Sequence, residues 1–214
     1  MNNKKNGKKI IKILKRLYPN SHCSLHYQNI FQLLVAVQLS AQCTDERVNI
    51  VTPNLFKELP AAEDFANVKK NRLEKLIHST GFYKNKSKNL INCSKKIIKN
   101  FNGKVPKKMD QLLTLDGIGR KTANVILGEG YGQSIGVVVD THVSRISGRL
   151  GFSGQKNPEK IEKDLMGIIP KSNWIIFTHL IIDHGRAICQ ARKPKCDQCQ
   201  LAHLCPGKIE TDKK

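Results

Sequence analysis

A lysine that follows a pair of glycines is the first residue of this chain whose surroundings suggest chemistry. Gly117 and Gly119 stand one residue apart, and the helix-favouring run from Arg120 to Ala123 begins directly after them. Glycine has no Cβ and tolerates positive φ, so this spacing predicts a tight hairpin whose amide groups point outward. Such amides beside a helix N-terminus form a site for an anion, and Lys121 would lie within that helix. These residues alone also allow an ordinary glycine turn with Lys121 as a solvated charge.

Four cysteines near the C-terminus form the second pattern that suggests chemistry. They are spaced C-x6-C-x2-C-x5-C, at Cys189, Cys196, Cys199 and Cys205. Thiolates this close in sequence can surround one metal centre, and zinc and a [4Fe–4S] cluster both accept four cysteines. A zinc ribbon uses two Cys-x2-Cys knuckles whereas this chain has one, so the spacing favours the iron–sulfur cluster. No histidine or carboxylate is positioned to act on a metal-bound water, so we expect a structural centre.

The loop inside the cysteine pattern is basic. Arg192, Lys193 and Lys195 lie between the first two cysteines, and we interpret them as a finger that the metal centre holds against phosphate groups. A solvated run of charges is the alternative. The whole chain carries 37 Lys and Arg against 17 Asp and Glu, which gives a net charge of +20 and a pI near 9.8. An excess of this size indicates a polyanionic partner, and nucleic acid is the usual one.

The remaining composition, with 39% hydrophobic and 25% charged residues, is that of an ordinary globular protein. The longest apolar run, Ile30–Leu39, is interrupted by Gln32 and Gln38 and is too short to span a bilayer. The Lys-rich N-terminus does not resemble a signal peptide. We therefore expect an intracellular, cytoplasmic protein with no membrane partner. In that compartment the cysteines outside the cluster, such as Cys93, are expected to be small buried hydrophobes rather than disulfides.

Helices are expected to position these residues, because apolar side chains recur at helical spacing and no period-two alternation is present. A first amphipathic helix, Lys8–Leu17, precedes an almost entirely apolar helix at Asn29–Gln42, which predicts a core helix. Further helices are expected at residues 46–58, 61–68, 69–79, 84–101, 110–115, 141–149, 158–168 and 173–184. Gly185 is expected to end the last of them. The sequence therefore predicts an all-α fold.

The segment after the hairpin helix leads to a single carboxylate. Gly128–Gly136 is rich in glycine and predicts an irregular connection, and Val137–Val139 predicts a short buried extended link. Asp140 follows directly, at a position where an acidic side chain caps a helix N-terminus. We expect Asp140 to cap the helix at residues 141–149, a function that is compatible with catalysis.

In combination, LDGIGRKTANVIL, VDTHVSR and HGRAIC with its downstream cysteines resemble the endonuclease III family of bacterial helix–hairpin–helix DNA glycosylases. LLVAVQLSAQCTDERVN and STGFYKNKSKNL match earlier segments of the family in order, so the resemblance covers nearly the whole chain. It implies an all-α, two-domain fold with a DNA-binding cleft between the domains. The six-helix domain with the helix–hairpin–helix would be residues 23–134, and the [4Fe–4S] domain residues 1–22 and 135–214. The resemblance further implies a monomer associated with the bacterial nucleoid.

The resemblance also implies an activity. The family excises oxidised pyrimidines such as thymine glycol from double-stranded DNA and then cuts the strand at the abasic site by β-elimination. Carried over by motif, Lys121 is the nucleophile and Asp140 the catalytic carboxylate. An amine that attacks C1′ of a flipped nucleotide displaces the base and leaves a Schiff base. The Schiff base acidifies the C2′ hydrogen and so permits strand cleavage.

Several residues are implied to contact DNA. Gln42 would fill the space left by the flipped nucleotide, and Phe82 would wedge into the duplex where the family usually has leucine. The hairpin and the basic finger would bind the backbone, through Gly117, Gly119, Arg120, Arg192, Lys193 and Lys195. Asp116 is a second departure, because the family's hairpin commonly carries proline there. A carboxylate repels a nearby phosphate, so we hypothesise that Asp116→Pro tightens DNA binding unless the carboxylate points away.

Other branches of the helix–hairpin–helix family fit less well. The adenine-excising branch lacks the lysine and carries a glutamate on the helix that here contains Val35-Ala36-Val37. The 8-oxoguanine glycosylases usually lack the cysteines, and monofunctional uracil or mismatch glycosylases usually replace the lysine. The alternative from a different class is a non-catalytic DNA-binding module, which predicts damage-independent binding with a steep salt dependence. In that case Lys121→Ala would have little effect.

Overall fold

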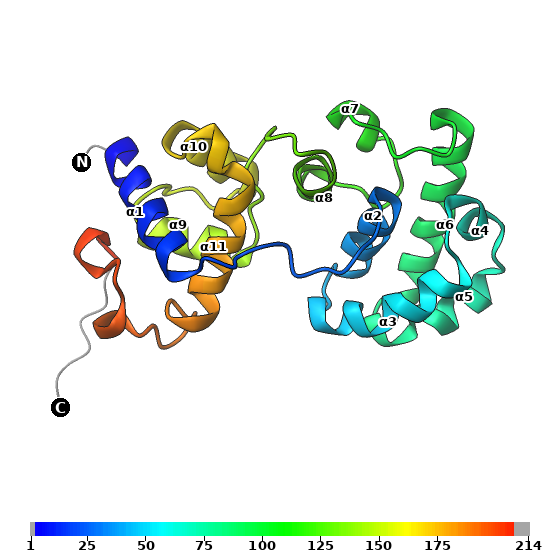
Figure 1. Cartoon of the computed structure of the whole chain (residues 1–214), viewed down its shortest axis with the longest axis horizontal. Helices are drawn as coiled ribbons and strands as arrows, with labels where there is room; N and C mark the ends of the chain where they lie inside the picture. The colour runs from blue at the N-terminus through cyan, green and yellow to red at the C-terminus, as the bar shows by residue number, and fades with distance from the viewer. Residues whose placement is uncertain (1–2, 208–214) are drawn as a thin grey trace. The chain divides into compact units, whose positions relative to one another are not determined.

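The computed structural model describes residues 3–207, and within that range it contains helices and turns but no strand. The predicted all-α fold is therefore confirmed. The chain forms two compact units (Figure 1). We call Ser24–Gln133 the hairpin unit, and we call residues 3–23 together with 134–207 the cysteine unit. No helix in the described range is both long enough and apolar enough to span a bilayer.

The hairpin unit is organised around one buried helix. Its helices are α2 (Ile30–Leu39), α3 (Asp45–Glu58), α4 (Ala62–Asn67), α5 (Lys70–Ile77), α6 (Tyr83–Phe101), α7 (Met109–Leu112) and α8 (Arg120–Val125). As predicted for a core helix, α2 is apolar on almost every side, and it packs against α3, α6 and α8. Leu33, Leu34 and Leu39 of α2 are buried, and burial of each such side chain stabilises the fold by about 1.5–3 kcal/mol.

Side-chain caps determine where the first helices of this unit begin. The side chain of Asn29 accepts a hydrogen bond from the Gln32 amide at 2.9 Å, and Thr44 Oγ1 accepts one from the Arg47 amide at 3.2 Å. These bonds satisfy amides that have no partner within their own helix. The sequence permits either Thr44 or Asp45 as the cap of α3, and Thr44 has that function.

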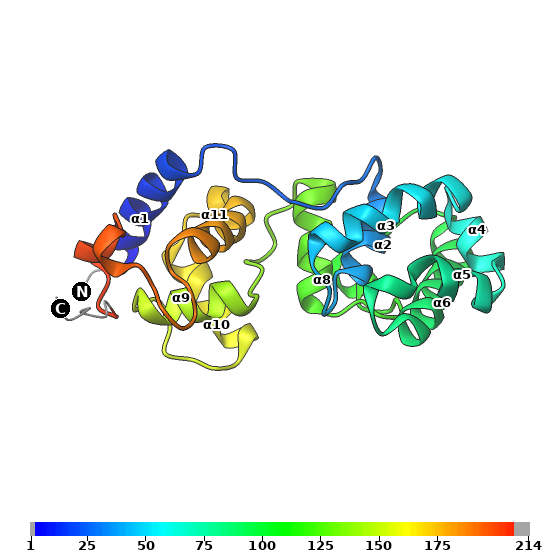
Figure 2. The ribbon, with the colours of Figure 1, turned by 90° about the horizontal axis from the view of Figure 1, so that it is seen from below.

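The longest helix of the unit, α6, packs against α4 and α5 (Figures 1 and 2). Its inward side includes Leu90, Cys93 and Ile97, all buried. Burial raises the pKa of the Cys93 thiol to about 12, so the thiol stays protonated at neutral pH. Cys93 is a small buried hydrophobe, as predicted, and none of the seven cysteines forms a disulfide.

The predicted irregular connection after α8 is partly wrong. The helical path continues through a π-helical segment, Ile126–Gly130, before the chain becomes irregular. Ile126, Leu127 and Gly128 are buried, and this segment packs against α2. A Cβ on Gly130 would lie 3.1 Å from Ile30 Cγ2, so glycine at this position permits close packing and does not mark a loop.

The cysteine unit combines one helix from the N-terminal part of the chain with three from the C-terminal part. Its elements are α1 (Asn3–Leu17), α9 (Thr141–Arg149), α10 (Pro158–Ile168), α11 (Trp174–Ala187) and the short turns Lys171–Asn173, Cys196–Gln198 and Ala202–Leu204. In both ribbon views α1 lies beside α11, which it contacts (Figures 1 and 2). Arg16 of α1 also donates a hydrogen bond to the side chain of Gln200 at 3.1 Å. The N-terminal helix is therefore connected to the cysteine segment.

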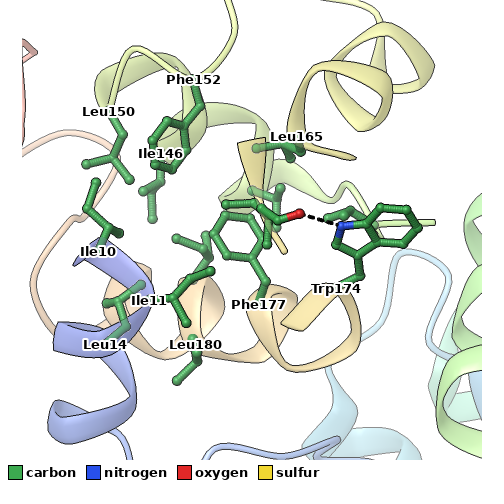
Figure 3. Close-up of a cluster of buried hydrophobic side chains, with 14 of the residues drawn as sticks. Ile10, Ile11, Leu14, Ile146, Leu150, Phe152, Leu165, Trp174, Phe177 and Leu180 are labelled. Carbon is green, nitrogen blue, oxygen red and sulfur yellow. Dashed lines mark hydrogen bonds between the residues drawn. The ribbon is translucent and has the colours of Figure 1, made fainter. Parts of the chain in front are cut away.

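Apolar side chains from α1, α9, α10 and α11 form the core of this unit (Figure 3). Ile10 and Leu14 of α1 are fully buried in it together with Phe177 of α11. The single tryptophan, Trp174, has its ring in this core and donates its indole N–H to the Ile169 carbonyl at 2.8 Å. The hydrogen bond satisfies the one polar group that burial of the indole would otherwise leave without a partner.

The predicted end of the last helix is also wrong. Gly185 does not terminate α11, which continues to Ala187. A Cβ on Gly185 would lie 2.5 Å from His142 Nδ1 and 3.0 Å from Ile146 Cδ1, both side chains of α9. Glycine at this position lets α9 and α11 approach closely, and a sequence pattern alone does not distinguish this use from a helix stop.

Candidate nucleic-acid interface and metal centre

The predicted hairpin joins α7 to α8, and its two glycines have different functions. Leu115 and Ile118 are buried and anchor the turn. Gly117 has a φ of +76°, and a Cβ there would lie 2.7 Å from the side-chain oxygen of Gln38, so backbone and packing both require glycine. Gly119 has a φ of −96°, and a Cβ there would meet nothing within 4 Å. Glycine at position 119 therefore leaves open space over the backbone, which an approaching ligand can use.

Lys121 is the second residue of α8, and its side chain is exposed. The helix beneath it is anchored, because Ala123 is fully buried and its amide donates to the Gly119 carbonyl at 2.9 Å. Arg120 is exposed beside it. A cationic pair therefore stands on a fixed helix directly after the hairpin, where a ligand bound to the hairpin is within its reach.

Asp116, the acidic residue inside the hairpin, pairs with a lysine of α6. Its carboxylate lies 2.8 Å from Lys96 Nζ, and the same ammonium group donates to the Thr114 carbonyl at 2.8 Å. This arrangement connects the hairpin to α6. It also offsets the negative charge of Asp116, so the expected repulsion between Asp116 and a phosphate is weaker than the sequence alone indicates.

Gln42 and Phe82 lie on exposed turns of the hairpin unit with an unusual backbone. Their φ angles are +54° and +48°, in the left-handed region that side chains other than glycine rarely adopt. Phe82 is also 63% exposed. The other non-glycine residue with positive φ among residues 3–207 is Asn102, which ends α6 in a common type of helix cap. Gln42 and Phe82 do not end a helix in this way, so their strained backbone supports a functional interpretation.

Asp140 caps α9, as predicted. Its Oδ1 accepts a hydrogen bond from the Val143 amide at 2.7 Å. A carboxylate has acceptor capacity beyond one such bond, so the cap leaves Asp140 able to accept a further proton or to face a positive charge. Asp140 belongs to the cysteine unit, and Lys121 belongs to the hairpin unit.

His142 is half-buried near this cap and interacts with Arg145. The Arg145 guanidinium lies 3.2 Å from His142 Nδ1, and since a guanidinium only donates, Nδ1 accepts. Burial lowers the pKa of His142, Asp140 partly opposes this shift, and Arg145 adds to it. The neutral imidazole is therefore the form that fits this structure.

The four C-terminal cysteines line one hollow in the cysteine unit. Its wall includes Ile146, Leu150, Ile188 and Leu201 besides the four thiols. Burial raises the pKa of the Cys199 and Cys205 thiols, so their thiolates need positive charge beside them. Within residues 3–207, no three His, Cys, Asp or Glu side chains are arranged to hold a single metal ion. A [4Fe–4S] cluster takes one thiolate at each iron, so thiols arranged around a hollow fit it.

One arginine of α9 holds the loop that carries the first of these cysteines. Arg149 donates to Cys189 Sγ at 3.2 Å, to the Gln190 carbonyl at 2.7 Å and to the Ala191 carbonyl at 2.8 Å. Cys205 Sγ in turn lies 3.2 Å from the Arg149 carbonyl. The planar guanidinium is suited to several donors with fixed directions. Arg149 therefore connects both ends of the cysteine segment to α9.

The basic finger follows this anchored stretch. Arg192, Lys193 and Lys195 are all exposed, whereas Pro194 between them is buried. The Lys195 amide donates to the Ile188 carbonyl at 3.0 Å and closes the loop. The three cations are therefore presented to solvent on a loop whose two ends are fixed.

Comparison with known proteins defines the class of this protein. Residues 35–171 match the HhH-GPD superfamily of base excision DNA repair proteins, and residues 189–205 match the iron–sulfur binding domain of endonuclease III. These ranges contain the hairpin with Lys121 and the four-cysteine segment. The fold and the two sites thus define a helix–hairpin–helix DNA repair enzyme with an iron–sulfur centre.

Individual relatives narrow this class. Endonuclease III of Synechocystis sp. is 54% identical over 95% of this chain and 93% of its own length. The Bacillus subtilis enzyme is 43% identical over 92% and 90%. A solved endonuclease III–DNA covalent intermediate matches with a TM-score of 0.90 and 42% identity over 96% of both chains. The chain belongs to the endonuclease III family.

Membership of this family confirms several of the sequence-based predictions. The protein is a base excision repair enzyme, a DNA glycosylase with abasic-site lyase activity, and it binds DNA. It carries a [4Fe–4S] cluster rather than zinc. A non-catalytic DNA-binding module is therefore the wrong alternative.

Two residues of these sites were not expected from the sequence. The sequence analysis assigns no function to Lys96 or Arg149, yet each organises a predicted site. The bond from Arg149 to Cys189 joins residues 40 positions apart, and no local spacing indicates it. The only sequence signal is weak, namely an arginine at the C-terminal end of the helix that Asp140 caps.

Proposed function

We propose that this enzyme removes oxidised pyrimidines, thymine glycol among them, from duplex DNA through a Schiff base on Lys121. It then cuts the strand at the abasic site by β-elimination. The observation that carries the proposal is the exposed Lys121 on an anchored helix, directly after a hairpin whose Gly119 leaves open space over the backbone. The covalent DNA intermediate of a relative that is 42% identical supports it.

Lys121 acts first. Its neutral amine attacks C1′ of the flipped nucleotide, the C1′–N bond breaks, and the damaged base leaves with the bonding electrons and a proton. The C1′–O4′ bond of the sugar then breaks, O4′ takes a proton, and the amine nitrogen and C1′ become an iminium, which withdraws electrons from C2′. Loss of a C2′ proton then expels the 3′ phosphate, and water releases the shortened strand from Lys121. Since Lys121 is exposed in the protein alone, the dry surroundings that favour a neutral amine would come from the bound DNA.

Asp140 is proposed as the catalytic carboxylate. Its bond to the Val143 amide orients one oxygen and fixes the side chain at the start of α9. The remaining acceptor capacity would stabilise positive charge as it develops on the sugar and would accept the proton that Lys121 loses. Capping and catalysis therefore use the same group at once.

The proposed DNA contacts fall into two classes. Gln42 and Phe82 would enter the duplex, with the exposed Phe82 ring stacking where the family usually has leucine. The backbone would be bound by the hairpin and the basic finger, through Gly117, Gly119, Arg120, Arg192, Lys193 and Lys195. Backbone contacts of this kind give affinity and position the enzyme, but they do not select a base.

Cys189, Cys196, Cys199 and Cys205 are proposed as the ligands of the cluster. The cluster would cross-link residues 189–205 and so fix the basic finger, and it takes no part in bond breaking. We further propose that the enzyme acts as a monomer and associates with the bacterial nucleoid, where its substrate lies.

Borohydride trapping on a duplex with one thymine glycol tests the proposal. The enzyme should form a covalent adduct that Lys121→Ala does not form, while both proteins retain the absorbance of the cluster. Asp140→Asn should slow adduct formation without weakening binding of the duplex. An adduct on a plain abasic site but not on thymine glycol would overturn the proposed substrate. An adduct that persists in Lys121→Ala would overturn the assignment of the nucleophile.

A further inference from the structure

One buried lysine of the hairpin unit is not used by the proposed mechanism. Lys86 is the fourth residue of α6 and is buried, although a lysine is almost never fully buried without a partner. Its Nζ donates to the Leu39 carbonyl at 2.7 Å and to the Thr80 carbonyl at 2.7 Å. A single ammonium group therefore joins two segments that are far apart in sequence.

Both carbonyl groups lie at the C-terminal end of a helical element, where the helix itself supplies no hydrogen-bond donor. Leu39 is the last residue of α2, so its carbonyl has no acceptor role within that helix. Thr80 ends the short 3-10 turn His78–Thr80 that precedes α6. A cation is favourable beside the carbonyl end of a helix because the carbonyl groups carry partial negative charge. Lys86 thus supplies a hydrogen bond to the last carbonyl of two helical elements at once.

Each of these ends leads directly into a residue proposed to enter DNA. Gln42 follows Leu39 by three positions, and Phe82 follows Thr80 by two. Both have left-handed backbone, which surrounding contacts must maintain. Lys86 also holds Phe82 through the main chain, because the Lys86 amide donates to the Phe82 carbonyl at 3.0 Å.

The surroundings of the Lys86 ammonium group indicate that it is stabilised by its two hydrogen bonds to carbonyl groups. Burial lowers the pKa of Lys86, and the nearby Cys43 thiol partly opposes this shift. A buried cation that faces carbonyl groups is stabilised only while both hydrogen bonds are made. Movement of either turn away from Lys86 would therefore leave this charge poorly solvated.

We propose that Lys86 is a positioning residue that couples the Gln42 turn to the Phe82 turn, so that the two side chains enter DNA as one unit. The proposal rests on the proposed DNA contacts of Gln42 and Phe82. A side chain that only stabilised the fold would lower stability when replaced, but it would not make the effects of Gln42 and Phe82 depend on each other.

A double-mutant cycle on DNA binding separates these possibilities. The probe is a duplex with a tetrahydrofuran abasic analogue opposite 2-aminopurine, whose fluorescence rises when this base unstacks. Dissociation constants are measured for Gln42→Ala, Phe82→Ala and the double variant, with Lys86 retained and with Lys86→Met. Lys88→Met is the matched control, because Lys88 is exposed on the same helix and its substitution removes the same charge.

With Lys86 retained, the double variant should lose less affinity than the product of the two single losses, by at least about threefold. In the Lys86→Met background, the affinity loss of the double variant should equal the product of the two single losses. The rise in 2-aminopurine fluorescence should also be smaller in Lys86→Met, even when Gln42 and Phe82 are both retained. Lys88→Met should preserve the coupling. Coupling that persists in Lys86→Met would overturn the proposal and leave Lys86 as a stabilising residue.

Two further results keep the test decisive. If Gln42→Ala and Phe82→Ala each leave the affinity unchanged, their proposed DNA contacts fail and Lys86 has nothing to position, whatever borohydride trapping gives. If Lys86→Met does not fold, Lys86→Gln is used, and hydrogen exchange is compared at residues 40–43 and 80–83. Faster exchange in both turns supports the coupling, whereas faster exchange in one turn alone contradicts it.

Discussion

In each unit of this protein a cation holds a loop by two carbonyl groups, Lys86 in the hairpin unit and Arg149 in the cysteine unit, and the two cations differ in what surrounds them. In the hairpin unit, Lys86 is buried and its ammonium group donates to the carbonyls of Leu39 and Thr80. In the cysteine unit, Arg149 is partly exposed and donates to two carbonyls and to the sulfur of Cys189. The first loop system depends on protein atoms alone, whereas the second shares its support with a cluster.

This difference explains the choice of residue. A lysine ammonium is compact and fits between two carbonyls inside a packed core, while the planar guanidinium reaches three acceptors spread over a surface loop. It also predicts that loss of the cluster affects one loop system and not the other. Loss of the cluster should loosen the basic finger and leave the Gln42 and Phe82 turns intact.

Removal of one proposed cluster ligand should have the largest effect among the variants that test this comparison. In Cys196→Ser we expect loss of the visible absorbance of the cluster and rapid hydrogen exchange over residues 188–207, because the hydrogen bonds from Arg145 and Arg149 do not replace the cross-link. DNA affinity should fall about tenfold or more, since the three cations proposed to bind the DNA backbone lose their fixed position. Exchange in the hairpin unit should stay unchanged, and loosening of the turns at Gln42 and Phe82 would contradict the independence of the two units.

Arg149→Lys should have an intermediate effect. Lysine keeps the charge but cannot reach the Gln190 and Ala191 carbonyls together with Cys189 Sγ. We expect the cluster to remain and DNA affinity to fall about threefold, since the cluster still fixes part of the loop. Fluorescence anisotropy with duplex DNA measures this loss, and Arg72→Lys, in the ion pair with Glu58, is the control. An affinity loss as large as that of Cys196→Ser would mean that Arg149, not the cluster, supports the finger.

Asp116 tests a third cation, Lys96, which is paired with a carboxylate instead of carbonyls alone. Asp116→Asn removes the negative charge and frees Lys96 toward DNA, so binding should tighten about twofold to threefold at low salt and less at high salt. Asp116→Pro should act in the same direction. Salt-dependent anisotropy measures the change, and Asp110→Asn on α7 controls for net charge. Weaker binding in Asp116→Asn would show that the ion pair is needed to shape the hairpin.

The smallest effect is expected from His142 as pH falls. Its folded pKa lies below the ordinary 6.5, so protonation costs more in the folded protein than in the unfolded chain. Its contribution to stability is complete above pH 6.5 and is lost as pH falls through the folded pKa. In urea unfolding, the free energy of unfolding of the native protein should fall relative to that of His142→Gln as the pH is lowered below 6.5. The difference between the two proteins should be constant above pH 7, and no change with pH would contradict the expected shift.

The sequence predicts those features whose signals are local. Spacing alone identified the glycine hairpin, the cap at Asp140 and the four cysteines, because each depends on residues within a few positions. The structure confirms the Asp140 cap at 2.7 Å from the Val143 amide. The roles of Lys121, Asp140, Gln42 and Phe82 in DNA came from the family resemblance, and they stay predictions.

The errors concern glycine and long-range bonds. The sequence predicts an irregular connection over Gly128–Gly136 and a helix end at Gly185, yet Gly130 and Gly185 each allow a neighbouring helix to approach. Local sequence does not reveal this use, since the neighbour is distant along the chain. The same reason applies to Lys86, whose bond to the Leu39 carbonyl spans 47 residues, and to Arg149. Among the basic residues of this chain, only the fold distinguishes those that hold loops from those that face solvent.

The division of the chain also has a consequence for its synthesis. The hairpin unit is one uninterrupted stretch, Ser24–Gln133, whereas α1 belongs to a unit whose remaining residues begin at Ser134. At bacterial translation rates, Cys205 leaves the peptidyl transferase roughly 4–15 s after Gln133 does. During that interval α1 has no core to join, and no iron–sulfur centre can be assembled. The ribosome therefore completes the unit that contains the glycine hairpin before the unit that contains the four-cysteine segment.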